Sequence, residues 1–501
     1  MEQDNLKQKV VKGTVWALFE RFSNQIIMFV VGIVLARLLT PTDYGTVALL
    51  SLFLAIASVL ADSGFGLALI QKKDVTELDF NSVFYCSLAV SGTLYIALFV
   101  AAPWIAQFYG VPVLVPILRI QAISLIFNSI NSIQNAEIAR NLKFNLSFRI
   151  SLITNISSAI VGIGMAFLGY GVWALVWSQI LSGLVGTIAR WFIVRWRPKF
   201  MFSFTALKPL FSFGWKMIFV NLLDSLYKNL YGLLVGKMYS KEDLAYVNKG
   251  QNQPSILMNS VEGTLASVTL PTFSKFQGDR EKMVNAMRKM ITCSSFVVFP
   301  MMTIFAFTAY GQVKLLYGDK WLPIVPYIQI ASFQMALYPF HNMNLQAIAS
   351  WGRTDLSLKI EVVKKIMSFI VVLIAVQYSV TALMMSIAFI VGPMAILINS
   401  FPNRKLFGYA IEDQVKDILP SVGLCCIIGV ALYLISLLNL HYFIILLLQC
   451  VVGGSLYLIC ACVFKVRGIR EYAHILGPKT ISKLPGKIQP YCLKLYNYIN
   501  R

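Results

Sequence analysis

Three basic side chains of this sequence lie within or beside long apolar runs, where they could bind an anion. Arg21 lies inside the first apolar run, and Lys228 and Lys249 lie in or next to two later ones. A charge is costly inside a membrane span and therefore marks a functional site by default. Because a guanidinium donates two parallel hydrogen bonds to a phosphate, Arg21 is the strongest candidate. The sequence predicts that these cations bind phosphate.

Each of these cations also has a structural explanation, which the sequence leaves open. Glu20 directly precedes Arg21 and could neutralise it, or the long arginine side chain could extend to the membrane surface. Asp224 and Lys228 are spaced i, i+4 with the acid first, which is the favourable order for an ion pair within one helix. Such a pair would leave Lys228 without a net charge to offer a substrate.

Amide and hydroxyl side chains form stripes on one helix face in the apolar runs 12–38, 114–138 and 246–272. Such groups hydrogen-bond sugar hydroxyls, but they also join helices to one another inside membranes. We expect them to line a water-filled cavity that binds sugars. The candidates are Asn24, Gln25, Asn128, Asn131, Asn252 and Asn259.

The elements that must position these side chains are membrane-spanning helices. The chain of 501 residues is 57% hydrophobic and only 13% charged, whereas about a quarter of the residues of a soluble domain are charged. A span needs about 20 largely apolar residues. Fourteen candidate spans fall at 12–38, 45–67, 81–106, 114–138, 148–169, 172–194, 210–236, 246–272, 286–309, 324–349, 357–378, 381–402, 417–438 and 441–464.

The distribution of basic residues predicts the orientation of the chain. The net charge of +21 would suggest a nucleic-acid partner in a soluble protein, but here the basic residues flank apolar runs and indicate contact with lipid headgroups. Lysine and arginine concentrate in alternate connections, for example Arg190, Arg195 and Arg197 around the end of the sixth run. By the positive-inside rule, both termini are cytoplasmic. We expect a multi-pass membrane protein that binds no nucleic acid.

An internal repeat divides the chain. A shift of 200 residues aligns the first run with the seventh, so that Arg37 meets Lys237 and Asp43 meets Asp243. An even number of spans separates the copies, so the two halves share one orientation and face a central cavity. An amphipathic segment joins them as an interfacial stretch or a plain linker. The predicted domains are an N-terminal lobe (1–197), this linker (198–209), a C-terminal lobe (210–404), two further spans (405–464) and a basic cytoplasmic tail (465–501).

Motifs of enzymes and metal sites are missing from the sequence. It has no Walker loop, no HExxH and no nucleophile elbow. The eight cysteines form no CxxC pair and there are only three histidines, so we expect neither a metal site nor a disulfide framework. A membrane glycosyltransferase would need a large outer loop with paired carboxylates, which the short connections do not provide. A polytopic chain with charged helix faces and no catalytic domain indicates a secondary transporter, not an enzyme.

Five short motifs point to one family. They are Ala36–Gly45 (ARLLTPTDYG), Asp62–Gly66 (DSGFG), Ala139–Phe144 (ARNLKF), Gly171–Val176 (GVWALV) and Tyr317–Trp321 (YGDKW). With these motifs the chain resembles, over residues 1–470, the Wzx-type exporters. These form the polysaccharide-transporter branch of the multidrug/oligosaccharidyl-lipid/polysaccharide flippase superfamily. The resemblance is greatest to the exporters of colanic acid and teichuronic acid.

The resemblance implies an all-α fold of about 14 transmembrane helices, in two pseudo-symmetric six-helix lobes plus two C-terminal helices around a V-shaped cavity. It implies alternating-access transfer of an undecaprenyl-pyrophosphate-linked oligosaccharide across the bacterial inner membrane, for assembly of O-antigen, capsule or exopolysaccharide. In the related lipid II flippases, cations on the first and neighbouring helices bind the pyrophosphate, and Arg21 matches such a position. The implied partners are the lipid-linked oligosaccharide, the phospholipid membrane, a polysaccharide polymerase and glycosyltransferases.

The energy source and one rival function stay open at this stage. Without an ATP site, the membrane potential or a gradient of Na⁺ or H⁺ must drive transfer, and no other cofactor is expected. Glu20, Asp224 and Glu262 are the candidates for ion coupling. The alternative function is a multidrug or small-cation exporter of the same superfamily. Such an exporter would need an anionic, aromatic-lined pocket, whereas Arg21 and Lys228 favour an anionic substrate.

Overall fold

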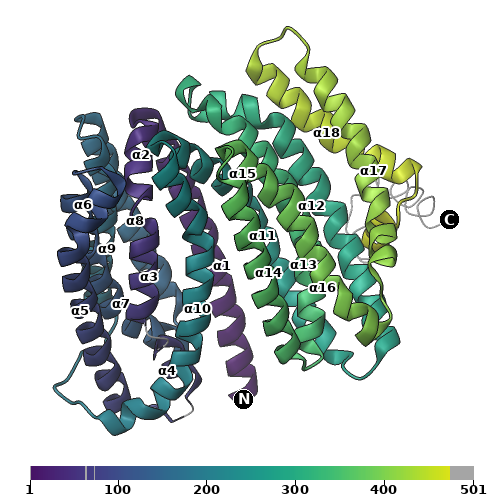
Figure 1. The fold of residues 1–501 in the computed structure, drawn as a ribbon. Coiled ribbons are helices and arrows are strands. Elements are labelled where there is room, and N and C mark those ends of the chain that lie inside the picture. The colour runs from purple at the N-terminus through teal and green to yellow at the C-terminus, as the bar shows by residue number, and fades with distance from the viewer. Residues whose placement is uncertain (1, 63–64, 73, 474–501) are drawn as a thin grey trace. The chain divides into compact units, whose positions relative to one another are not determined.

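The computed structural model describes residues 2–62, 65–72 and 74–473, and over these ranges the chain consists of helices and their connections (Figure 1). The predicted all-α fold class is therefore confirmed. The chain forms two compact units, Met1–Ala245 and Tyr246–Arg501, which we call unit 1 and unit 2. Of the predicted tail at 465–501, the residues from position 474 onward lie outside the described residues.

Long helices packed side by side build unit 1 (Figure 1). Helix α1 packs on α8, α8 on α9, and α10 on α3. The helices of this unit are α1 (Glu2–Leu38), α2 (Pro41–Ala48), α3 (Ser51–Asp62), α4 (Phe65–Gln71), α5 (Glu77–Tyr109), α6 (Leu114–Gln121), α7 (Ile123–Arg140), α8 (Phe144–Phe167), α9 (Val172–Ile193), α10 (Phe204–Met238) and the start of α11 (Lys241–Lys275).

The helix that the sequence assigns to the start of the C-terminal lobe packs in unit 1. Helix α10 contacts α3, α4 and α5, and the first compact unit extends to Ala245. The hydrophobic pattern of a helix shows that one face is covered, but it does not show which neighbour covers it. The lobe boundaries drawn from the repeat stay predictions.

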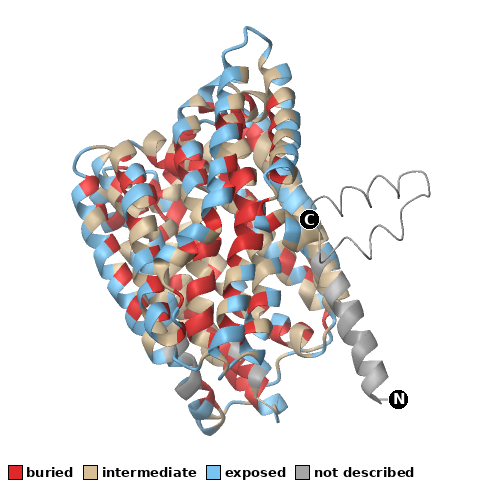
Figure 2. Ribbon diagram, turned by 90° about the vertical axis from the view of Figure 1, so that its right-hand side faces the viewer, coloured by how far each residue is buried: buried red, intermediate tan, exposed pale blue. Residues whose placement is uncertain are grey.

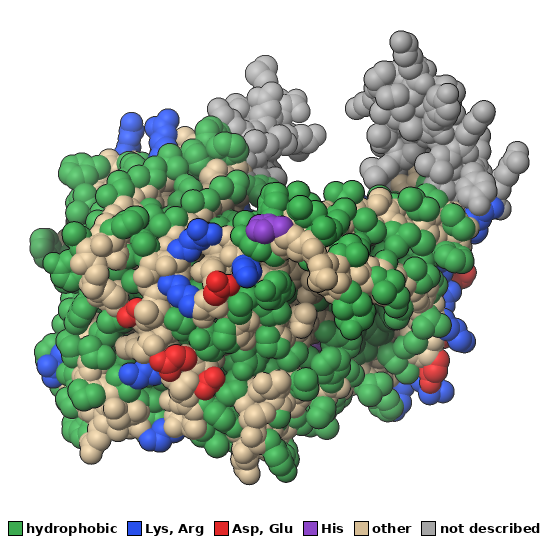
Figure 3. Space-filling view, turned by 90° about the horizontal axis from the view of Figure 1, so that it is seen from above, with side chains coloured by type: hydrophobic (Ala, Val, Ile, Leu, Met, Phe, Trp, Pro, Cys, Tyr) green, Lys and Arg blue, Asp and Glu red, His purple; other side chains and the backbone are tan. Residues whose placement is uncertain are grey.

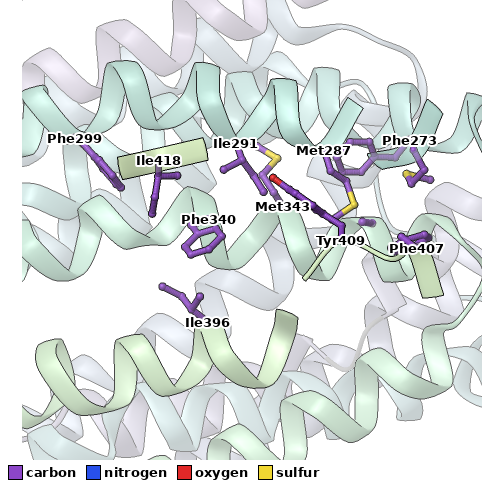
Figure 4. Packing of buried hydrophobic residues seen from close by; sticks show 12 residues of the cluster. Phe273, Met287, Ile291, Phe299, Phe340, Met343, Ile396, Phe407, Tyr409 and Ile418 are labelled. Atoms are coloured by element: carbon purple, nitrogen blue, oxygen red, sulfur yellow. The ribbon is translucent and has the colours of Figure 1, made fainter. Parts of the chain in front are cut away.

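Unit 2 is built around a core of large apolar side chains contributed by α11, α12, α13, α16 and α17 and the turn before α17. Figure 4 shows part of this core, with Phe299, Phe340 and Ile418 among the labelled side chains. Flexible methionines such as Met287 and Met343 fill the space between the aromatic rings. The elements of this unit are the rest of α11, α12 (Arg280–Leu316), a 3₁₀-helix (Asp319–Ile324), α13 (Val325–Ser350), α14 (Thr354–Ala375), α15 (Val380–Ser386), a π-helix (Ile387–Val391), α16 (Gly392–Phe407), α17 (Ile411–Ser436) and α18 (Tyr442–Val463).

The surface of the helices is that of a membrane protein. In the described part of the chain, nine helices are long and apolar enough to cross a membrane, and α2 with α3, bent by 41°, makes a tenth if the two form one span. Many outer helix faces are exposed (Figure 2), and they carry large apolar side chains such as Trp104 and Phe192. Hydrophobic side chains also cover much of the face in Figure 3, with charged ones scattered among them. Helices α10, α11, α13 and α14 form where four further spans are predicted but are not among the nine, so the count of fourteen stays a prediction.

The internal repeat has a local counterpart in the structure. Helices α1 and α10 end, and α2 and α11 begin, at positions 200 residues apart. At each start a short side chain and an acid three residues later exchange hydrogen bonds with the backbone, Thr40 with Asp43 and Ser240 with Asp243. The same capping interaction therefore starts a new helix at both places.

The two repeated helix starts touch each other. The hydroxyl of Thr42 donates a hydrogen bond to the carboxylate of Glu242. This hydrogen bond is the main reason why the pKa of Glu242 lies below its usual range. A Cβ atom at Gly45 would lie only 2.0 Å from the backbone oxygen of Lys241, so only glycine permits this approach. The contact joins the related segments tightly at one end of unit 1.

Candidate functional site

A polar cavity lies inside unit 1, between α3, α7, α9 and α10. Its volume is about 460 Å³, within the range of small-molecule sites. Its walls combine amides, hydroxyls, one carboxylate and one guanidinium. They are Ser58, Val59, Ala61, Asp62, Asn128, Ser129, Asn131, Ser132, Asn135, Arg190, Ile218 and Asn221.

Helix α7 supplies the polar wall because its amides and hydroxyls recur at helical spacing. Asn128, Asn131 and Asn135 are separated by three and four residues and therefore project from the same side of α7. Asn131 is buried, and its Oδ1 atom has no hydrogen-bond partner. The structure thus brings two of the predicted sugar-binding residues, Asn128 and Asn131, into one cavity. Their role in binding stays a prediction.

The two charged residues of the cavity were not among the predicted site residues. Arg190 on α9 donates from Nε to the side-chain oxygen of Asn135 and from Nη1 to the backbone oxygen of Gly186, both at 3.0 Å. Asp62 is the last residue of α3. The sequence places Arg190 among the basic residues of a cytoplasmic connection, and Asp62 stands in one of the family motifs. The polar stripe on α7 could have indicated Arg190 and Asp62, because a buried polar helix face requires polar side chains on the helices packed against it.

On α1 the predicted polar face is divided between two surroundings. Glu20 accepts hydrogen bonds from two serine hydroxyls of α8, and Asn24 accepts one from Asn155 of the same helix, each at 2.8 Å. Arg21 and Gln25 are exposed on the other side of α1. Glu20 and Asn24 therefore join α1 to α8.

On α10 the structure confirms the ion pair suggested by the spacing of Asp224 and Lys228. Their charged atoms are 2.8 Å apart, and both side chains are substantially exposed. The phosphate-binding role of Lys228 stays a prediction, and its charge is offset by its own helix. Asn221, one turn before Asp224, lines the polar cavity.

The predicted site residues of unit 2 all lie on α11. The ammonium of Lys249 lies 4.8 Å from the ring centre of Tyr317 and 5.7 Å from that of Trp321. Asn252 and Asn259 are exposed on α11. The carboxylate of Glu262 accepts hydrogen bonds from the phenol of Tyr338 at 2.9 Å and from the amide of Asn342 at 3.2 Å.

A second cavity, of about 590 Å³, lies in unit 2 between α12, α13 and α17, and it is apolar. Aromatic and aliphatic side chains such as Phe307, Phe333 and Val430 line it. A site of this composition suits a hydrocarbon ligand because it offers few hydrogen-bond partners.

Comparison with known proteins establishes the family. The family described as "Polysaccharide biosynthesis protein" matches residues 34–326, more than half of the chain. The chain belongs to this polysaccharide biosynthesis protein family. It is 23% identical over 444 residues to the teichuronic acid biosynthesis protein TuaB of Bacillus subtilis (87% of this chain, 91% of that one). It is 22% identical over 370 residues to the lipopolysaccharide biosynthesis protein WzxC of Escherichia coli (72% of this chain, 74% of that one). The resemblance to Wzx-type exporters is confirmed.

Two solved structures show the fold. The lipid II flippase MurJ in an inward closed conformation superposes with a TM-score of 0.72 at 18% identity, over 90% of this chain and 98% of that one. An inward-facing MATE multidrug transporter superposes with a TM-score of 0.61 at 16% identity, over 77% of this chain and 94% of that one. The predicted flippase-superfamily fold is therefore confirmed.

Proposed function

We propose that this protein is a flippase that moves an undecaprenyl-pyrophosphate-linked oligosaccharide from the cytoplasmic to the outer leaflet by alternating access. It lies in a bacterial inner membrane with both termini in the cytoplasm and supplies surface polysaccharide assembly. The observation that carries the proposal is the polar cavity with amides and a guanidinium inside a bundle whose outer faces are apolar. The relatives named for teichuronic acid and lipopolysaccharide biosynthesis support it.

The proposal follows from the chemistry of such a substrate. A pyrophosphate cannot cross hydrocarbon without compensation of its charge, and a glycan cannot cross without hydrogen-bond partners. Arg21 of unit 1 supplies a cation, and the cavity of unit 1 supplies amides and hydroxyls. The apolar cavity of unit 2 suits part of the polyprenyl chain. Transfer in this scheme makes and breaks no covalent bond, so the protein acts as a transporter and not as an enzyme.

Deletion of the gene tests this function. A deletion strain should lose its surface polysaccharide and accumulate the lipid-linked precursor, because the glycan no longer reaches the polymerase on the outer face. The gene on a plasmid should restore the polysaccharide. A deletion strain with normal polysaccharide and new sensitivity to cationic drugs would instead support a multidrug exporter.

We propose that Glu262 couples transfer to an Na⁺ or H⁺ gradient. Among the three candidate carboxylates, Asp224 is paired with Lys228 and Glu20 is bound by two serines of α8. Glu262 accepts hydrogen bonds only from neutral groups, and no ion pair of it is present in the described part of the chain. A coupling ion at this carboxylate would therefore meet no competing ion-pair partner among the described residues.

Replacing Glu262 by glutamine removes the titratable charge and keeps the shape, so transfer should lose its response to the gradient. The measurement is flipping of an undecaprenyl-pyrophosphate-linked sugar in proteoliposomes with an imposed Na⁺ or H⁺ gradient. Glu281→Gln, at the exposed start of α12, is the control. An unchanged response in Glu262→Gln would exclude this carboxylate from coupling.

A further inference from the structure

Two opposite charges line the polar cavity of unit 1 without neutralising each other. Arg190 on α9 and Asp62 at the end of α3 both contribute to its wall, but they form no ion pair. Opposite charges in a partly desolvated space attract strongly, so they stay apart only where the backbone holds them apart. The space between them is suited to a ligand that carries both an anionic group for Arg190 and hydrogen-bond donors for Asp62.

The guanidinium of Arg190 retains donors for such a ligand. It has five N–H donors, of which one on Nε goes to Asn135 and one on Nη1 goes to Gly186. These two bonds fix the plane of the guanidinium. The whole Nη2 group and the second Nη1 hydrogen have no hydrogen-bond partner among the described residues. They are the donors that bind the two oxygens of a carboxylate or phosphate.

The rest of the wall offers acceptors. The carboxylate of Asp62 accepts no hydrogen bond from any described residue. The Oδ1 atom of Asn131 is buried without a partner. A buried acceptor without a donor costs free energy, so the Asn131 oxygen indicates a ligand with an O–H group. The exposed Asp62 carboxylate offers a second acceptor on the wall of the same cavity.

We propose that this cavity binds one anionic sugar unit of the oligosaccharide. The carboxylate or phosphate of the sugar binds Arg190, and its ring hydroxyls donate to Asp62 and Asn131 and exchange hydrogen bonds with Asn128. Arg190 disfavours a metal cation, although the nearby Glu20 carboxylate partly offsets its charge. A bare inorganic anion does not fit, because Asp62 repels it and the oxygen acceptors stay unpaired. The inference rests on the proposed function and adds the identity of the sugar subsite.

Binding of small sugars to the purified full-length protein in detergent tests the proposal. The probes are glucuronate as the carboxylate source, glucose 1-phosphate as the phosphate source, neutral glucose, and inorganic phosphate. Saturation-transfer NMR detects weak binding of each. At least one anionic sugar should bind, about tenfold or more tightly than glucose or phosphate, and the stronger of the two identifies the source of the anion. Equal binding of all four probes, or of none, would overturn the proposal.

Substitutions locate the binding. Asp62→Asn and Arg190→Gln should each weaken binding of the anionic sugar about tenfold, because each removes a charge-assisted hydrogen bond. Asn128→Ala should weaken it too. The exposed side chain of Asn128 makes no hydrogen bond to any described residue, so this variant should fold and keeps the test valid even if Arg190→Gln does not fold. Arg353→Gln and Asp355→Asn form the matched control, since that arginine and aspartate pair with each other outside the cavity.

The outcome separates this inference from the proposed function. If deletion abolishes surface polysaccharide but the variants bind the anionic sugar as the wild type does, the flippase stands and the subsite is wrong. If the variants lose binding but deletion leaves the polysaccharide intact, the subsite stands and the flippase proposal is wrong.

Discussion

Replacement of Arg21 by alanine is expected to abolish polysaccharide export while the protein still reaches the membrane. Arg21 is exposed on α1, beside exposed Phe22 and Ile26, and Glu20 on the same turn is bound by two serine hydroxyls of α8. A bidentate contact between guanidinium and phosphate stabilises the complex by about 3 kcal/mol, so its loss lowers transfer roughly 100-fold. The measurement is surface polysaccharide in the deletion strain carrying each variant, with membrane protein quantified by immunoblot.

The comparison with other cations makes this prediction specific. Lys228→Ala should reduce export much less, because the charge of Lys228 is offset by Asp224 at 2.8 Å. Arg21→Lys should give an intermediate level, since it keeps the charge but loses the planar fork. Arg37→Ala removes a cation from the far end of the same helix, about 24 Å away, and should leave export close to wild type. Normal export by Arg21→Ala would remove this residue from the substrate site.

Features that repeat along the sequence could be predicted from it. The 200-residue shift pairs Asp43 with Asp243, and both acids close capping interactions at helix starts, because local hydrogen bonding needs only residues three positions apart. The amide stripe on α7 was also visible, because one helix face collects positions three and four apart. The pairing of Asp224 with Lys228 follows from the same geometry.

Features that depend on depth and on neighbouring helices could not be predicted in this way. Arg190 stands near the end of its run and was therefore grouped with the basic connection, although it lines a cavity. Asn24 belongs to the predicted polar face of α1, but α8 supplies a partner for it. Lys249 lies against the rings of Tyr317 and Trp321, which are far away in the sequence. Spacing identifies a helix face, whereas the tertiary fold decides what covers it.

A cluster of charges joins α12, α17 and the residues after α18 in unit 2. Asp417 of α17 accepts hydrogen bonds from Arg288 at 2.9 Å, from the phenol of Tyr409 at 2.6 Å and from Arg467 at 3.3 Å. Asp417 is nearly buried, whereas Arg467 is half exposed. Burial, and then the neighbouring Asp417 carboxylate, raise the pKa of Tyr409, so the phenol stays a donor at neutral pH. One carboxylate thus holds two guanidiniums and a phenol.

Asp417→Ala should therefore lower the free energy of unfolding by about 2 kcal/mol, less than the full cost of breaking a buried ion pair because Arg467 is half exposed. It leaves Arg288 and Arg467 close together without the shared acid, so the residues after α18 should also become sensitive to protease. Thermal unfolding in detergent and limited proteolysis followed by mass spectrometry measure both effects. Asp413→Ala is the matched control one turn earlier on α17, where an exposed aspartate lies 3.9 Å from Lys416 and contributes little. Equal stability of the two variants would show that Asp417 does not hold this cluster together.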